Sequence, residues 1–251
     1  MKKPTKHMSA MLIASAALLN SQTVLAQTGF EQEYKITVTN ITPNSLFTPV
    51  AAIAHVPGVK LYTLGKPAIP ALVAVAEAGD THRLMNLMED LPNIIKDYAV
   101  SDGVVPPGGS VTLWLSANEA SHVSVVSMLI PSNDTFFALN GKKIPPEGHL
   151  VHFSPALDAG SETNDESCDH VPGPPSVCNP GGQGLSPDDH GEGFVHVSRG
   201  ISGDGDIPVA YDWRNPVAKI EVMRVPMDGG MCRLPQPRGG DAAFSGGAEP
   251  N

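Results

Sequence analysis

The fold is decided by a stretch of chain that opens with Leu129–Phe137, which reads LIPSNDTFF. In this segment an apolar run of the kind found in strands breaks at a proline and meets Asp134. The stretch closes with a tight acidic turn, LDAGSE at residues 157–162, which carries Asp158 and Glu162. We expect the two ends to return to the same rim of a β-sheet, so that the three carboxylates come together.

Between these ends, Asn140-Gly141 predicts a turn and Leu150–Phe153 is a short apolar segment, so we expect the stretch to form a hairpin-like excursion. Gly160 lets the chain fold sharply enough for the carboxylates on either side of it to face one centre. Three carboxylates without a nearby Lys or Arg repel one another, which raises a pKa or recruits a cation. A hard divalent ion, above all calcium, is the expected occupant. The alternative is that Asp158 caps its own turn and that Asp134 is an Asx-turn residue.

The first 26 residues have the pattern of a bacterial signal peptide. Met1–Lys6 is a positively charged region, Met8–Leu19 is an apolar region, and small residues precede a cleavage site expected near Ala26. The apolar region is shorter than the roughly 20 residues that a membrane span needs, and no later segment qualifies. We expect a mature protein that is secreted or periplasmic.

Acidic residues dominate the mature chain. Removing Lys2, Lys3 and Lys6 leaves 13 basic against 26 acidic residues, a net charge of −13. Residues 158–206 alone contain ten Asp or Glu and a single Lys or Arg, Arg199. Such a surface argues against binding to nucleic acid or anionic lipid. The acidic segment is either a set of solvated loops or a surface whose negative electrostatic potential attracts cations.

Three cysteines occur in the mature chain. In an oxidising compartment Cys168 and Cys178 are expected to close a short disulfide loop, which leaves Cys232 over. A zinc site from Cys168, His170, Cys178 and His190 is the alternative, although the spacing fits no standard zinc finger.

The hydrophobic pattern predicts an all-β protein. Alternating or continuous apolar runs predict strands at residues 33–42, 47–55, 110–115, 122–130, 194–198 and 218–225. Helix formers interrupt this pattern over residues 67–91, where Gly79 is expected to end one short helix in a left-handed cap. We therefore expect one domain, residues 33–225, folded as an antiparallel β-sandwich with a short helical insertion. The Gly- and Pro-rich residues 226–251 are expected to form a disordered tail.

Other candidate sites have simpler explanations. His55, His152 and His196 lie in or beside predicted strands and are expected to be core or face histidines. Asp204-Gly205-Asp206 resembles half of a calcium loop but lacks the remaining ligand positions, so a solvated turn is expected. Asp212-Trp213-Arg214 predicts a structural anchor, in which an aromatic side chain stands beside a charged pair and leads into the final strand.

No motif of an enzyme is visible. The sequence contains no Gly-x-Ser-x-Gly, His-Glu-x-x-His or Cys-x-x-Cys motif and no phosphate-binding glycine loop. A carboxylate pair could serve a glycosidase, and Asp134 with His152 could form half of a hydrolytic site. Neither set has a third partner at a recognisable spacing, so we expect a protein without catalytic activity.

Five segments in chain order carry a resemblance to a known family: residues 34–40, 55–68, 126–134, 158–162 and 211–218. Together they resemble the spondin domain, in the form found in secreted bacterial proteins. Its animal relatives are the amino-terminal domains of F-spondin and mindin. The resemblance extends over about residues 33–225 and implies a C2-like β-sandwich with a calcium ion at one end of the sheets.

The resemblance also implies the ligands of that ion. The family's Ser-x-Asp and Asp-Ala-Gly-x-Asp motifs match Asp134, Asp158 and Glu162, the last of which departs from the family by being Glu instead of Asp. The implied function is a secreted calcium-binding module that attaches to a cell-surface, matrix or glycan ligand. Two alternatives are a metal-dependent hydrolase of envelope or matrix polysaccharide and a purely structural envelope protein.

Overall fold

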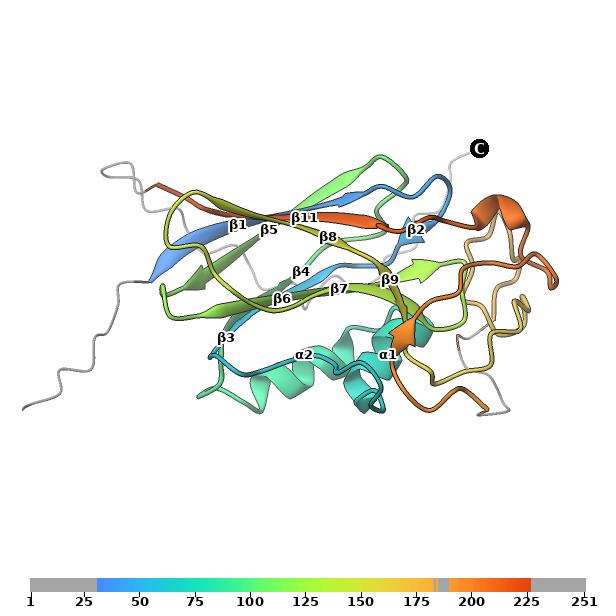
Figure 1. The fold of residues 1–251 in the computed structure, drawn as a ribbon, viewed down its shortest axis with the longest axis horizontal. Coiled ribbons are helices and arrows are strands. Elements are labelled where there is room, and N and C mark those ends of the chain that lie inside the picture. Colours follow the sequence, from blue (N-terminus) through green and yellow to red (C-terminus); the bar gives the residue numbers. More distant parts are fainter. Residues whose placement is uncertain (1–30, 183, 185–189, 227–251) are drawn as a thin grey trace, which may run out of the picture.

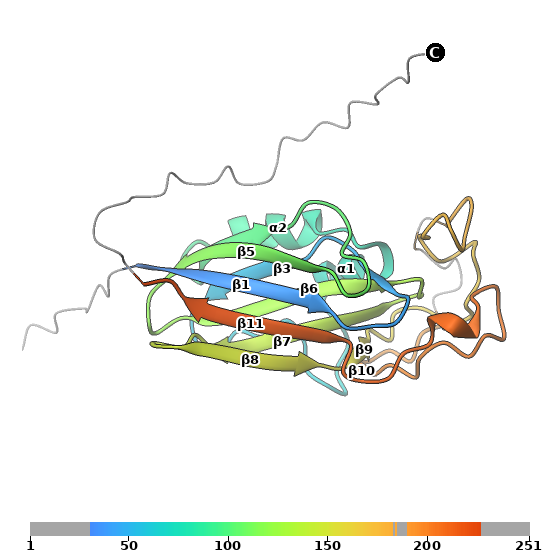
Figure 2. The ribbon, with the colours of Figure 1, turned by 90° about the horizontal axis from the view of Figure 1, so that it is seen from above.

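The computed structural model describes residues 31–182, 184 and 190–226, which form two β-sheets and a pair of helices stacked in layers (Figure 1). The four-stranded sheet has the order β5-β1-β11-β8, and Figure 2 shows these strands side by side. Its strands are β1 (Gln32–Asn40), β5 (Ser110–Ala117), β8 (His149–Ser154) and β11 (Ala218–Arg224).

The second sheet has seven strands in the order β10-β9-β7-β6-β3-β4, with β2 paired to β6. Its strands are β2 (Leu46–Phe47), β3 (Ala51–His55), β4 (Ile95–Val100), β6 (His122–Ile130), β7 (Thr135–Lys143), β9 (Ala156–Asp158) and β10 (His196–Val197). All strand pairs in both sheets are antiparallel. The predicted antiparallel β-sandwich is therefore confirmed.

The helical insertion lies where the sequence predicts it. It consists of α1 (Pro70–Ala78) and α2 (His82–Glu89), and Gly79 ends α1 in the left-handed conformation with φ 65°. Among the described residues, no helix is long and apolar enough to cross a membrane.

The main core lies between the two sheets. On β1, Tyr34, Ile36 and Val38 are fully buried, whereas the residues between them are partly exposed, as the alternating pattern of the sequence predicts. Their partners on the facing sheet include Val125 of β6 and Phe137 of β7. Each fully buried apolar side chain of this kind contributes about 1.5–3 kcal/mol to stability.

The helices explain why β6 is apolar along almost its whole length. They cover the outer face of the seven-stranded sheet, where Phe136 and Val126 form a second core with Leu72 and Val75 of α1 (Figure 1). The central strands of this sheet are thus buried on both faces, and a strand in that position has no polar side.

The predicted turn at Asn140-Gly141 is wrong. Both residues lie inside β7, where the pairing with β6 shifts register between Val123 and Val125. At this bulge the Gly141 N–H donates to Ser124 Oγ (2.9 Å), outside the regular ladder. Because β6 and β7 pair directly, the true hairpin turn is at residues 131–134, which places Asp134 immediately before β7.

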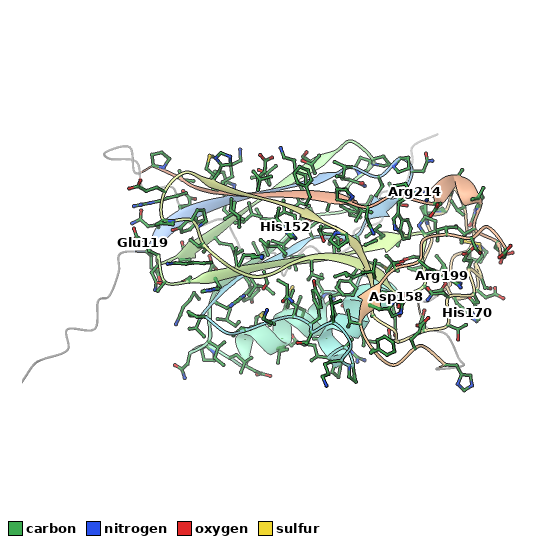
Figure 3. All side chains as sticks on the ribbon, in the orientation of Figure 1. Glu119, His152, Asp158, His170, Arg199 and Arg214 are labelled. Atoms are coloured by element: carbon green, nitrogen blue, oxygen red, sulfur yellow. A yellow bond between two sulfur atoms is a disulfide. The ribbon has the colours of Figure 1, made fainter. Side chains whose placement is uncertain are left out.

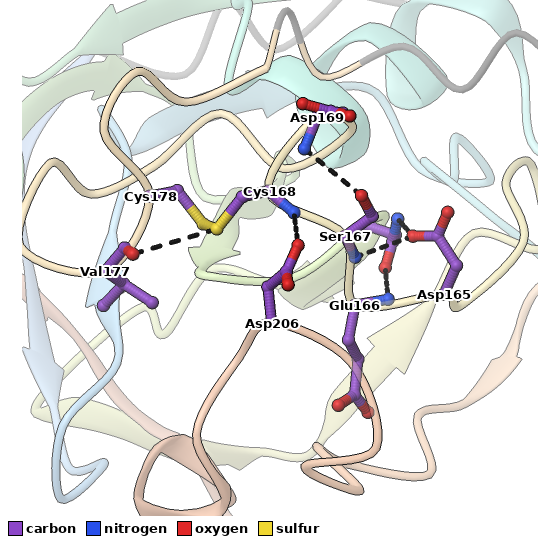
Figure 4. The surroundings of a disulfide bond; sticks show 9 residues. Asp165, Glu166, Ser167, Cys168, Asp169, Val177, Cys178 and Asp206 are labelled. Atoms are coloured by element: carbon purple, nitrogen blue, oxygen red, sulfur yellow. Dashed lines mark hydrogen bonds between the residues drawn. A yellow bond between two sulfur atoms is a disulfide. The ribbon is translucent and has the colours of Figure 1, made fainter.

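Long loops between β9 and β11 gather at one end of the sandwich (Figure 1). A disulfide joins Cys168 to Cys178 (Figure 4), as the sequence predicts, so neither cysteine offers a thiolate to zinc. Trp213 is 4% exposed, and Arg214 pairs with Asp212 beside it, which confirms the predicted anchor. The predicted signal peptide, Cys232 and all but the first residue of the predicted tail lie outside the described residues.

Glu166 fixes two of these loops to each other. Its side chain is buried, although its backbone has a positive φ of 56°, and its carboxylate accepts the N–H (2.6 Å) and hydroxyl (2.8 Å) of Ser202 and the N–H of Gly203 (2.8 Å). Burial on its own raises the pKa of Glu166, but these donors and the Gly205 N–H outweigh it and hold the pKa below its usual value.

This arrangement predicts an acid-sensitive contribution to stability. A Glu166→Gln substitution should lower the free energy of unfolding at pH 7 by about 2 kcal/mol or more, because an amide cannot accept hydrogen bonds with both of its heavy atoms. Since the pKa of Glu166 is lower in the folded state, its stabilisation is complete above the ordinary value of about 4.3 and is lost as the pH falls through the folded-state value.

The measurement is urea unfolding between pH 7 and pH 3, and the gap between wild type and Glu166→Gln should shrink over that range. Glu221→Gln is the control, because Glu221 pairs with Lys219 on the surface at 2.9 Å. This substitution should change the free energy of unfolding by less than about 1 kcal/mol. A cost of Glu166→Gln that stays the same at pH 3 as at pH 7 contradicts the assignment.

Candidate metal centre

Asp134 and Asp158 lie next to each other at one end of the seven-stranded sheet. Asp134 comes just before Thr135, the first residue of β7, and Asp158 is the last residue of β9. Thr135 pairs with Asp158 across the two strands, and the Ala159 N–H donates to the Asp134 carbonyl (3.2 Å). Figure 3 shows Asp158 at the end of the molecule where the loops gather.

The Asp134 carboxylate is fully buried, and only half of it is satisfied. Its Oδ2 accepts hydrogen bonds from the Ser161 N–H (2.8 Å), the Ser161 hydroxyl (3.2 Å) and the Glu162 N–H (3.2 Å). Its Oδ1 is buried and has no hydrogen-bond partner. A buried carboxylate oxygen without a donor is costly, so a proton or a cation at this atom would stabilise the fold.

The charges around Asp134 make its ionised form more costly still. Burial, followed by the charge of Asp158, raises the pKa of Asp134 well above its usual range, and the charge of Glu162 adds to the effect. Burial also raises the pKa of Asp158, and the Glu192 carboxylate contributes. Among the described residues, no Lys or Arg forms an ion pair with Asp134 or Asp158.

The three residues expected from the sequence are thus brought to the same end of the sheet. Asp134 and Asp158 are fully buried, Glu162 is 2% exposed, and the backbone of Glu162 contacts Asp134. Carboxylate oxygens are the ligands that a hard divalent cation prefers, but the ligand atoms of these three residues do not form a group within 4.8 Å of one another. A bound cation would let the buried carboxylates stay ionised.

Gly160 makes the close approach of a further loop possible. It has a positive φ of 66°, and a Cβ built on it would lie 2.3 Å from the Phe194 carbonyl oxygen. The Gly193 N–H donates to the Gly160 carbonyl (2.8 Å), and a Cβ on Gly191 would lie 2.4 Å from the same oxygen. Glycines on both sides therefore let residues 191–194 pack directly against the acidic turn.

This loop brings in Glu192 and His196, which the sequence does not assign to the site. His196 pairs with Asp158 across β9 and β10, so the two side chains lie on the same face. Ligand atoms of Asp158, Glu192 and His196 all lie within 4.8 Å of one another. His196 lies in the predicted strand 194–198 and Glu192 lies two residues before it, so an acid and a histidine four residues apart were the available local signal.

His196 is half-buried, as expected for a face histidine, but its ring faces carboxylates. Its Nε2 lies 3.3 Å from Asp158 Oδ1 and 3.4 Å from Glu192 Oε2. Burial opposes protonation, yet the Val197 carbonyl and the two carboxylates together raise the pKa of His196. Of the other two histidines, His55 is a core residue, 1% exposed, bound to Ser124 Oγ (2.9 Å), and His152 is half-buried on β8.

The close contact of Gly160 with residues 191–194 predicts that a side chain at position 160 would destabilise this end of the protein. Gly160→Ala should destabilise the protein by more than the roughly 1–2 kcal/mol that a left-handed conformation costs a residue with a Cβ, because the new methyl group meets a carbonyl. Gly58→Ala is the matched control, since Gly58 has a φ of 89° and open space around its Cβ position. Thermal melting of the two variants should show the larger loss for Gly160→Ala, and equal losses would contradict the close approach.

Comparison with known proteins identifies the first part of the chain. No curated protein matches the sequence. The Spondin_N family model matches residues 22–144, a range that includes Asp134 and stops before Asp158, Glu162, Glu192 and His196. This match confirms the resemblance seen in the sequence and marks an extracellular type of domain. Over these residues the chain contains a spondin N-terminal-like domain.

Proposed function

We propose that this protein is a secreted, calcium-binding spondin-domain protein that acts outside the cell or in the periplasm as a binding or adhesion module without catalytic activity. The observation that carries the proposal is the buried Asp134 carboxylate, whose Oδ1 has no hydrogen-bond partner although the charge of Asp158 is close by. A buried, unpaired carboxylate oxygen lowers the stability of the fold unless a bound ligand or a proton offsets its desolvation cost.

Calcium fits this position better than a proton does. A proton would neutralise one carboxylate and leave the charges of the others facing each other, whereas a divalent ion interacts with all of them. Asp134, Asp158 and Glu162 would supply carboxylate oxygens, and backbone carbonyls or water would complete the six to eight ligands that calcium takes. The ion would hold the acidic turn against the ends of β7 and β9.

The burial of the site favours a binding module over a polysaccharide hydrolase. A glycosidase needs two carboxyl groups that reach either side of a glycosidic bond in a large substrate. Asp134 and Asp158 have no exposed surface, and Glu162 has almost none. A buried ion at this place can shape the surrounding loops, and those loops are what a partner would contact.

Apolar side chains are exposed on the segments beside the site. Gly65 and Lys66 form backbone hydrogen bonds with Val195 (2.8 and 2.9 Å), which joins residues 64–66 to the strand that carries His196. Along these two segments Leu64, Phe194 and Val197 are 56%, 42% and 53% exposed. Exposed apolar groups within an acidic loop region suit a binding surface for a cell-surface, matrix or glycan ligand.

Calcium should stabilise the mature protein in proportion to its occupancy. At a calcium concentration 100-fold above the Kd, the gain is about 2.7 kcal/mol, or a rise in Tm of about 5–10 °C for a domain of this size. EDTA should remove the gain. Asp134→Asn should abolish the calcium response and, because it removes a buried charge, should melt in EDTA no lower than wild type.

Asp204→Asn is the matched control, because Asp204 is an exposed acidic residue in the turn that resembles half of a calcium loop. This variant should keep the full calcium response. If Asp134→Asn gains as much from calcium as wild type does, the buried carboxylates are not the binding site and the proposal fails.

A further inference from the structure

The cluster of Asp158, Glu192 and His196 has the spacing of a coordination shell. His196 Nε2 lies 3.3 Å from Asp158 Oδ1 and 3.4 Å from Glu192 Oε2. These distances are longer than ordinary hydrogen bonds. They match the edge of about 3.3 Å between two ligands of a tetrahedral ion with bonds of about 2.0–2.1 Å.

The His196 ring faces the two carboxylates with its Nε2 atom. Its Nδ1 lies 3.0 Å from the Val197 carbonyl oxygen, to which it can only donate a proton. In the neutral ring Nε2 is then the acceptor. This atom is buried and makes no hydrogen bond. A lone pair directed at two carboxylate oxygens is repulsive, so this geometry needs either a proton on Nε2 or a metal cation between the three groups. A backbone carbonyl on the other nitrogen is the usual support of a metal-bound histidine.

Asn164 positions both carboxylates for the same centre. Its Nδ2 donates to Asp158 Oδ2 (2.8 Å) and lies 3.5 Å from Glu192 Oε1. The other oxygen of each carboxylate is the one that faces His196. Arg199 in turn donates to the Asn164 carbonyl (2.5 Å), which anchors the loop that carries the amide. Figure 3 shows Arg199 and Asp158 at the same end of the molecule.

We propose that Asp158 Oδ1, Glu192 Oε2 and His196 Nε2 bind a divalent transition cation of the zinc class. The imidazole nitrogen decides the class, because calcium takes oxygen ligands whereas zinc combines histidine nitrogen with carboxylate oxygen. Three protein ligands leave a fourth position for water. The side chains of Glu192 and His196 are 42% and 25% exposed, so the ion can enter from solvent.

This zinc position is separate from the proposed calcium position. The two share Asp158, whereas Asp134 and Glu162 belong to the calcium set and Glu192 and His196 to the zinc set. Substitutions of Asp134 or Glu162 should therefore remove calcium and keep zinc. Substitutions of Glu192 or His196 should remove zinc and keep calcium.

The test is isothermal titration of the metal-free mature protein with Zn²⁺ and, separately, with Ca²⁺. His196→Gln and Glu192→Gln should each weaken Zn²⁺ binding at least tenfold and leave Ca²⁺ binding unchanged. Asp134→Asn should do the reverse. Asn164→Ala should weaken Zn²⁺ binding about tenfold, as the loss of a supporting contact does.

His82→Gln is the control for zinc bound by surface histidines, because His82 Nδ1 pairs with Asp80 at 2.9 Å without a second carboxylate. It should bind Zn²⁺ like wild type. If His196→Gln and Glu192→Gln both keep wild-type Zn²⁺ affinity, the zinc site is refuted and the calcium proposal stands. If they lose both cations together, there is one common site and the separate position is refuted. A wild type that binds Zn²⁺ but not Ca²⁺ refutes the calcium proposal alone.

Discussion

Two buried carboxylates of like charge, Asp134 and Asp158, set the constraint on which this end of the protein depends. They stand at the ends of neighbouring strands β7 and β9, without exposed surface, and none of the described Lys or Arg residues pairs with them. Desolvation opposes the ionisation of both carboxyl groups, and the charge of Asp158 further opposes that of Asp134. A protein relieves such a cost by protonation, by hydrogen bonding or by a cation, and hydrogen bonds satisfy only one oxygen of Asp134.

The rest of the fold keeps these carboxylates in place. The seven-stranded sheet lies between the four-stranded sheet and the helices, so its central strands have little freedom to move. The loops beyond β9 are irregular, and they are held by the Cys168–Cys178 disulfide, by the Glu166 carboxylate and by the contact of Gly160 with residues 191–194. These contacts give the irregular end enough order to present charged side chains at defined positions.

Local patterns were enough to predict most of the framework. The alternation in β1 and β11 and the apolar run of β6 each follow from burial on one or both faces. The pair Asn140-Gly141 led to a wrong prediction, because these residues form a β-bulge instead of a turn. The Asn140 side chain accepts a hydrogen bond from the Leu61 N–H (2.8 Å) and donates one to the Tyr62 carbonyl (2.9 Å). No local pattern shows that these two distant segments meet.

The candidate site was predictable only in part for the same reason. Asp134, Asp158 and Glu162 lie beside Pro and Gly signals that mark strand ends. Glu192 and His196 join them through the pairing of β9 with β10, a contact between segments almost forty residues apart that no spacing rule contains. The central claim is tested most directly by elemental analysis of purified mature protein after equilibration with calcium and gel filtration. The account predicts about one calcium per chain in wild type and none in Asp134→Asn, whereas wild-type protein without bound calcium would contradict it.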